Sequence, residues 1–112
     1  VDRAAQDAAR ASVRAAGLAE QVTFRQCDGG AALADLADGS VDLLFLDAER
    51  VEYPAWWPHP MRVLRPGGLL VADNATSHPE EIAPLRDLVA AEPGMVTITV
   101  GVGKGELLAL RR

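Results

Sequence analysis

Residues 41–47 read VDLLFLD, and residues 64–74 read LRPGGLLVADN. Each stretch contains a nearly continuous apolar run that ends at an acidic residue, Asp47 in the first and Asp73 in the second. Strands covered on both faces have this composition, and they occur mainly in parallel sheets flanked by helices. The two stretches therefore predict two buried strands, each with an acid at its carboxyl end.

The chain on either side of these stretches alternates between helical and extended patterns. Helices are predicted at residues 2–17, 31–37, the second half of 51–64 and 79–92, and further strands at 22–26, 95–100 and 106–110. Asp2 and Gly17 suit the two ends of the first helix. The last two strands are joined by a short loop, which favours antiparallel pairing. The expected fold class is α/β, a mostly parallel sheet with helices on both faces and an antiparallel C-terminal strand pair.

Composition limits the classes of function. A chain of 112 residues, 49% hydrophobic and 24% charged, suits one domain. The net charge of −5 disfavours a broad basic surface for nucleic acid. A single cysteine, Cys27, cannot form an internal disulfide, no apolar run approaches the ~18 residues of a membrane span, and residues 1–16 do not resemble a signal peptide. We therefore expect a cytoplasmic protein without a membrane segment.

Polar side chains gather where the two buried strands end. Ligands bind beyond the carboxyl ends of strands in open α/β sheets. If the strands are neighbours, about 4.8 Å apart, Asp47, Asp73 and Asn74 converge on one crevice. Such oxygen donors suit Mg²⁺ or Ca²⁺. The alternative is that the two aspartates only cap the elements that follow them, and spacing alone does not choose between these interpretations.

The chain resembles the metal-dependent class I O-methyltransferases, the group that contains the catechol and caffeoyl-CoA O-methyltransferases. The resemblance rests on residues 41–50, VDLLFLDAER, followed by Tyr53, and on residues 64–74. It covers essentially the whole chain and weakens after Ala75. It implies a Rossmann-like fold that uses S-adenosylmethionine, and it makes the metal interpretation the favoured one.

The resemblance assigns roles to particular residues. Asp47, Asp73 and Asn74 match the three metal ligands of the family, and Asp47 also lies where the methionine part of S-adenosylmethionine is approached. Asp28 and Gly29 match the pair that contacts the adenine. Asp28 would accept the exocyclic amine, and Gly29 would let the ring lie close to the backbone. A helix that begins with Asp and Gly explains the same pair and is compatible with that role.

Two positions depart from the family pattern. Arg50 stands where the family commonly has a lysine that helps to deprotonate or stabilise the substrate hydroxyl. Arginine keeps its proton in proteins, so Arg50 can stabilise an oxyanion but cannot be a general base. Its alternative role is an exposed charge or an ion pair with Glu49 or Glu52. The other departure is Lys104, where relatives often carry aspartate.

The glycine-rich cofactor loop of the family is missing. No Gly-x-Gly-x-x-Gly occurs in the chain, and the family's ribose-binding acid would precede Val1. The first two strands of the family would lie between the 22–26 and 41–46 strands. We therefore expect a fold that is incomplete at its N-terminus, either part of a longer chain or a homodimer in which a second copy covers the open sheet edge.

The predicted activity is transfer of a methyl group from S-adenosylmethionine to a hydroxyl of a small, aromatic vicinal diol, assisted by a divalent cation. A catalytically inert, truncated domain that persists as an oligomer is the alternative, and a metal-independent methyltransferase is a third reading. Some bacterial relatives modify hydroxylated tRNA bases, but the acidic charge balance disfavours a nucleic-acid partner.

Several conspicuous residues receive structural roles. Tyr53, Trp56 and Trp57 form an aromatic cluster for which packing is favoured over an acceptor pocket. Cys27 is favoured as a small buried filler. His59 and His78 have no partner at metal-ligand spacing, and Arg62, Arg65, Arg111 and Arg112 are expected to be solvated.

Overall fold

The computed structural model describes residues 2–112, in which a mixed sheet has the strand order β1-β2-β4-β3. The strands are β1 (Val41–Leu46), β2 (Leu64–Asp73), β3 (Met95–Val100) and β4 (Glu106–Arg111). The helices are α1 (Arg3–Ala15), α2 (Gly29–Asp35), α3 (Tyr53–Trp56), α4 (His59–Arg62) and α5 (Pro79–Ala91), with short 3₁₀ turns η1 (Ala19–Gln21) and η2 (Arg50–Glu52). β1 and β2 are parallel, whereas β4 is antiparallel to both β2 and β3.

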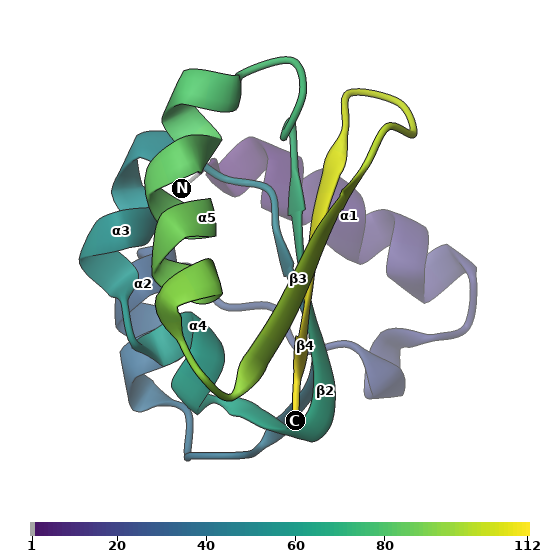
Figure 1. The fold of residues 1–112 in the computed structure, drawn as a ribbon. Coiled ribbons are helices and arrows are strands. Elements are labelled where there is room, and N and C mark those ends of the chain that lie inside the picture. Colours follow the sequence, from purple (N-terminus) through teal and green to yellow (C-terminus); the bar gives the residue numbers. More distant parts are fainter. Residues whose placement is uncertain (1) are drawn as a thin grey trace.

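Helices α2, α3, α4 and α5 lie on one side of the sheet (Figure 1). Leu70 on β2 and Leu107 on β4 are fully buried on that side, beneath the buried face of α5. α5 presents Ile82, Leu85 and Val89 to the sheet, at the spacing that one face of a helix requires. The main hydrophobic core therefore lies between the sheet and these helices.

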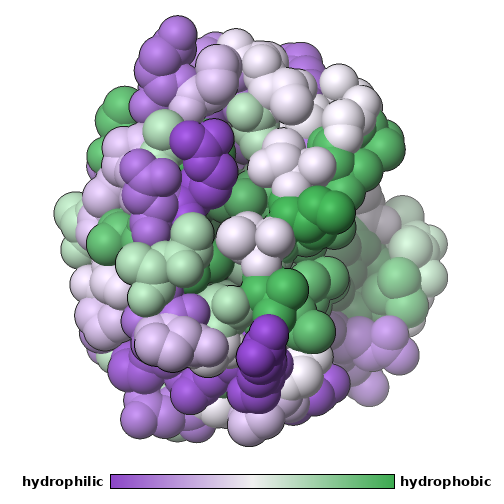
Figure 2. All heavy atoms as spheres, in the orientation of Figure 1, coloured by the Kyte–Doolittle hydropathy of each residue, from purple (hydrophilic) through white to green (hydrophobic). Residues whose placement is uncertain are grey.

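The opposite face of the sheet is apolar and largely uncovered. Two rows of side chains cross it in register, the first made of Leu43, Leu69, Leu110 and Val96, the second of Phe45, Val71, Leu108 and Ile98. Phe45 is 54% exposed and Ile98 is 62% exposed. Hydrophobic residues are visible at the surface along the β3–β4 hairpin in Figure 2. Contiguous exposed apolar surfaces of this kind are uncommon on monomeric proteins and mark interaction surfaces.

The sheet differs from the expected one in the number of its strands and in the length of β2. Residues 22–26 form no strand, because none of the other strands lies beside them, and the sheet is consequently mixed rather than mostly parallel. β1 has no neighbour on one side among the described residues. β2 begins before the apolar run at residues 69–72, where the strand was predicted, since its pairing with β1 starts at Leu64 and continues past an irregularity at residues 65–68.

Local signals set the helix boundaries. Asp2 caps α1 through a 3.1 Å hydrogen bond from the Ala5 amide, and Gly17 follows the helix with a φ of +75°, as predicted. A helix was predicted for the second half of residues 51–64, and α4 lies there. The first half holds η2 and α3, and prolines, which cannot donate a helical hydrogen bond, keep these segments short. None of the helices within residues 2–112 is both long and apolar enough to span a membrane.

Candidate functional site

The parallel pairing of β1 with β2 brings two aspartates to one edge of the sheet. Leu46 lies opposite Ala72, so Asp47 and Asp73 follow as adjacent residues at the carboxyl ends of their strands. Neither aspartate caps a helix: the N-cap residues of η2 and α5 are Glu49 and His78, and neither makes a side-chain cap hydrogen bond. Asp73 instead accepts the adjacent Asn74 amide at 2.7 Å. The capping interpretation of these aspartates is therefore wrong.

A third carboxylate, Glu106, lies beside Asp73 and was missed by the sequence reasoning. Glu106 begins β4 directly opposite Asp73 in the antiparallel ladder. Its Oε2 atom is buried and has no hydrogen-bond partner among the described residues. Desolvation raises the pKa of Glu106. The neighbouring Asp73 carboxyl group and the charge of Asp47 raise it further. The sequence does contain a signal for this residue, since residues 106–110 read ELLAL and Glu106 is the one charged residue at the start of an apolar strand.

Asn74 is held in an unusual backbone conformation. It is the buried polar residue among those described, 8% exposed, and its φ is +67°. Its side-chain nitrogen donates to Ser77 Oγ at 2.9 Å, which leaves the amide oxygen available as a donor atom for a cation. Non-glycine residues with positive φ are uncommon, and they cluster at functional sites.

A cavity of about 720 Å³ opens where β1 and the start of α2 meet. It brings together four of the predicted site residues, Asp28, Gly29, Asp47 and Arg50. Asp73 and Asn74 do not line this cavity. Cys27 does line it, and so do Asp2, Ala48, Glu49, Glu52 and Trp56. The predicted residues therefore form two adjoining groups that meet at Asp47.

Asp28 has the structural role that the sequence predicted. Its Oδ2 accepts the Ala31 amide at 3.0 Å and caps α2. A carboxylate has further lone pairs after accepting one amide, so the cap and a contact with a ligand are compatible.

Arg50 is paired, with a partner that the sequence did not predict. Its Nε donates to Glu81 Oε2 on α5 at 2.8 Å, rather than to Glu49 or Glu52. This pair links the cavity wall to α5 and is only partly exposed. The guanidinium group has further donors on its two terminal nitrogens, so the ion pair does not use up its capacity to bind an anion.

The aromatic residues pack rather than stand free. Tyr53 is fully buried, and its hydroxyl accepts the Ala48 amide at 2.8 Å and donates to the Ala48 carbonyl at 3.2 Å. Burial raises the pKa of Tyr53, so the hydroxyl keeps its proton. Trp57 packs against the core, whereas Trp56 also lines the cavity. The predicted packing role is confirmed for Tyr53 and Trp57.

Three arginines expected to be solvated make specific contacts. Arg62 pairs with Asp38, and Arg65 donates to Asp42 at 2.6 Å. Arg111 donates to the main-chain carbonyls of Met61, Arg62 and Leu64. These contacts lie away from the cavity and hold the loops at the opposite end of the sheet.

The donor chemistry at the strand ends fits a hard divalent cation. No ion pair within residues 2–112 neutralises Asp47, Asp73 or Glu106, and the charges of Asp47 and Asp73 both act on Glu106, a repulsion that a proton or a cation would relieve. Carboxylate and amide oxygens are the ligands that Mg²⁺ and Ca²⁺ prefer. The described side chains, however, hold no ready cluster of three His, Cys, Asp or Glu with metal-binding geometry.

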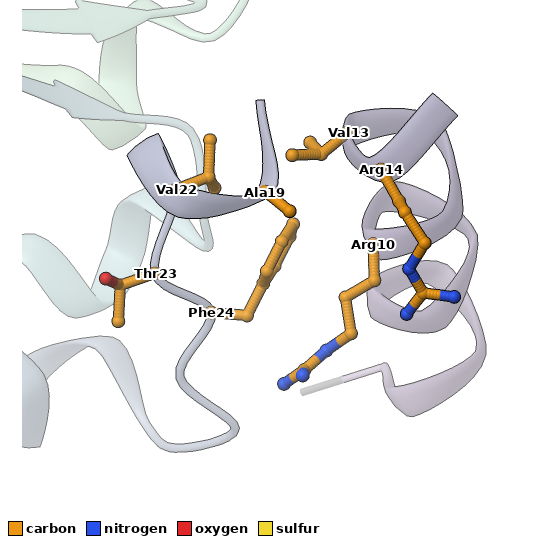
Figure 3. Close-up of a pocket in the computed structure, with 7 residues that line it drawn as sticks. All are labelled: Arg10, Val13, Arg14, Ala19, Val22, Thr23 and Phe24. Atoms are coloured by element: carbon orange, nitrogen blue, oxygen red, sulfur yellow. The ribbon is translucent and has the colours of Figure 1, made fainter. Parts of the chain in front are cut away.

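A second hollow, of about 340 Å³, separates α1 from the segment that follows η1 (Figure 3). Val13, Val22 and Phe24 contribute apolar surface, and the Arg10 guanidinium lies 5.1 Å from the centre of the Phe24 ring. This cation–π contact helps to attach α1 to the segment after it. None of the predicted site residues lies here, so the hollow is a packing junction.

Replacing Glu106 by glutamine tests the electrostatics of this edge. Because the pKa of Glu106 is raised in the fold, ionising it destabilises the folded state, and this loss develops as the pH rises from about the ordinary value of 4.5. Glu106→Gln is therefore expected to raise the free energy of unfolding at neutral pH, and the gain should vanish in acid. Urea unfolding in metal-free buffer across the pH range measures it. Glu20→Gln, at an exposed position in η1, is the control, and equal pH profiles for the two variants would contradict the assignment.

Comparison with known proteins identifies the family of this chain. The profile of the O-methyltransferase family matches residues 1–110. A relative from Mycolicibacterium vanbaalenii, named as an O-methyltransferase, is 34% identical over 91 residues, which are 70% of this chain and 40% of the relative. One from Mycobacterium avium is 33% identical over 91 residues, 70% of this chain and 41% of the relative. The chain spans about two fifths of the length of these curated relatives.

Solved structures show the same fold. An O-methyltransferase from Bacillus cereus in complex with SAH has a TM-score of 0.87 and 22% identity over 100% of this chain and 60% of its own. The O-methyltransferase TomG from Streptomyces achromogenes, in complex with SAM, has a TM-score of 0.82 and 22% identity over 98% and 58%. The α/β, Rossmann-like fold with an antiparallel C-terminal strand pair is thereby confirmed. The family profile, which matches nearly the whole sequence, shows that this chain belongs to the O-methyltransferase family.

Proposed function

We propose that the 112 residues form the C-terminal portion of an enzyme that transfers a methyl group from S-adenosylmethionine to a hydroxyl oxygen. The observation that carries the proposal is the cavity at the carboxyl end of β1, where Asp28, Gly29 and Asp47 meet. Ligands of open α/β sheets bind in this position. The SAH and SAM complexes of the similarly folded relatives support the choice of cofactor. The single cysteine is consistent with an enzyme of the cytoplasm.

In this proposal the residues of the cavity bind and orient the two reactants. Asp28 accepts the exocyclic amine of the adenine, and Gly29 keeps the backbone free of a side chain beside the ring. The Asp47 carboxylate faces the positively charged methionine end. The acceptor oxygen attacks the methyl carbon in line with the departing thioether sulfur, a reaction for which positioning supplies much of the rate.

We also propose that Asp47, Asp73 and Asn74 hold a divalent cation, with Mg²⁺ as the expected ion. A divalent cation there supplies Lewis-acid polarisation that lowers the pKa of a substrate hydroxyl. A small, aromatic vicinal diol is the acceptor that this arrangement suits. Arg50 would stabilise the developing oxyanion through its terminal nitrogens while its Nε stays bound to Glu81.

Isothermal titration with S-adenosylhomocysteine tests the cofactor site. The wild-type chain is expected to bind, and Asp28→Asn is expected to weaken binding by about tenfold or more, because one charge-assisted hydrogen bond is worth about 1.5–3 kcal/mol. Asparagine still caps α2, so the loss reports the carboxylate. Asp87→Ala, at an exposed position on α5, is the control.

The inert, oligomeric domain remains the second candidate, favoured by the uncovered sheet face and by the absence of a glycine-rich loop from the sequence. If folded wild-type protein gives no heat of binding with S-adenosylhomocysteine, this candidate is supported and the cofactor site is contradicted.

Thermal unfolding with and without Mg²⁺ tests the cation site. A ligand that binds only the folded state stabilises it, by about 2.7 kcal/mol when present at one hundred times its dissociation constant. Mg²⁺ is therefore expected to raise the Tm of the wild-type chain, and Asp73→Ala should abolish the increase. Asp87→Ala should respond like wild type, and NaCl at matched ionic strength controls for screening. An equal response of the Asp73 variant would refute the ligand assignment.

We propose that the uncovered face makes the isolated chain a homodimer. The apolar rows that include Phe45 and Ile98 are the surface that a second copy would cover. Phe45→Asp is expected to give monomers in sedimentation equilibrium, whereas Val51→Asp, at a 66% exposed position outside the sheet, should leave the dimer intact. Wild-type protein that stays monomeric at tens of micromolar would overturn the proposal.

A further inference from the structure

Two segments that lie far apart in sequence form the walls of the 720 Å³ cavity, and α3 touches both. One wall is the loop after β1, which contains Asp47 and Ala48. Tyr53 fixes this wall through its two hydrogen bonds to the main chain of Ala48. Because Tyr53 is fully buried, the loop is anchored to the core of the protein.

The other wall is the first turn of α2, and Trp56 packs directly on it. A methyl group at Gly30 would lie 2.6 Å from Trp56 Nε1 and 2.7 Å from Cδ1, and one at Gly29 would lie 3.1 Å from Cη2. Real side chains essentially never approach as closely as the Gly30 distances. The indole therefore occupies the space that a side chain at position 30 would need, and this contact requires glycine there.

The two aromatic rings connect the walls. The Tyr53 and Trp56 ring centres are 5.2 Å apart with a 52° angle between the planes, an arrangement in which aromatic pairs attract. Asp28 lies at the end of this connection. Its Oδ2 accepts the Ala31 amide at 3.0 Å, so a shift of the first turn of α2 also moves the carboxylate.

We propose that Trp56 is a positioning residue that holds Asp28 at a fixed place relative to Asp47. This inference rests on the proposed function, because it assigns the two aspartates to opposite parts of the same bound S-adenosylmethionine. Trp56 acts through the main chain of Gly29 and Gly30, whose close approach to the indole leaves the first turn of α2 no room to shift toward α3. The aromatic cluster thereby serves the cavity as well as the core.

The contact between Trp56 and Gly30 can be tested in the ligand-free chain, because the effect of Gly30→Ala on the Tm should change sign when Trp56 is removed. Alanine is a better helix former than glycine, so a helical glycine with free space gains stability when replaced. In the wild-type background Gly30→Ala is expected to lower the Tm, because the methyl collides with the indole. In a Trp56→Ala background the same substitution should raise the Tm. Gly94→Ala, in the turn before β3 where a methyl meets nothing within 4 Å, controls for the loss of backbone freedom in the unfolded chain.

Affinity for S-adenosylhomocysteine tests the positioning role. Trp56→Ala is expected to weaken binding about tenfold, the equivalent of 1.4 kcal/mol, and Trp56→Phe should recover part of the loss because a ring still covers Gly29. Trp57→Ala is the matched control, since Trp57 packs against the core but does not line the cavity. It should cost stability without weakening the binding of S-adenosylhomocysteine.

The outcomes separate the two proposals. If the wild-type chain binds no S-adenosylhomocysteine, the cofactor site is contradicted. The sign of the Tm change caused by Gly30→Ala in the two backgrounds would still decide whether Trp56 packs on the first turn of α2. Binding by the wild type with equal affinity in Trp56→Ala would overturn the positioning role and leave the cofactor site standing. Gly30→Ala with the same sign in both backgrounds would overturn the contact itself.

Discussion

The parallel hydrogen bonding between β1 and β2 is the constraint on which the candidate site depends. It aligns Leu46 with Ala72 and thereby sets Asp47 beside Asp73. A shift of one residue would turn one aspartate to the other face of the sheet, because side chains alternate along a strand. The buried side chains Leu70 and Ala72 oppose such a shift, since it would also expose them. The hydrophobic core therefore fixes the position of the acidic edge.

The strands with strong apolar runs could be predicted from the sequence. Residues 41–46, 95–100 and 106–110 were placed almost to the residue, because burial on a sheet imposes a pattern that neighbours in sequence reveal. Residues 22–26 have a convincing alternating pattern and still form no strand. A strand needs a partner for its hydrogen bonds, and local sequence cannot show whether a partner is present.

The residues of the site could be predicted from the sequence, but the side chains that contact them could not. Asp28, Gly29, Asp47 and Arg50 were named from motifs, and they line one cavity. Glu81 as the partner of Arg50, and Glu106 beside Asp73, come from segments more than thirty residues away along the chain. Such pairings depend on how α5 and β4 pack, which no local pattern records. The same limit hid the contact of Trp56 with Gly30.

The order of the strands also governs when this sheet can form. β4 is the last strand in the sequence, yet it lies between β2 and β3 and pairs with both. Neither neighbour has its complete set of ladder hydrogen bonds until β4 arrives, and contacts between residues distant in sequence form slowly. During synthesis from the N-terminus, β2 and β3 emerge first with apolar surfaces exposed. The sheet of the nascent chain therefore stays incomplete until β4 has left the ribosome.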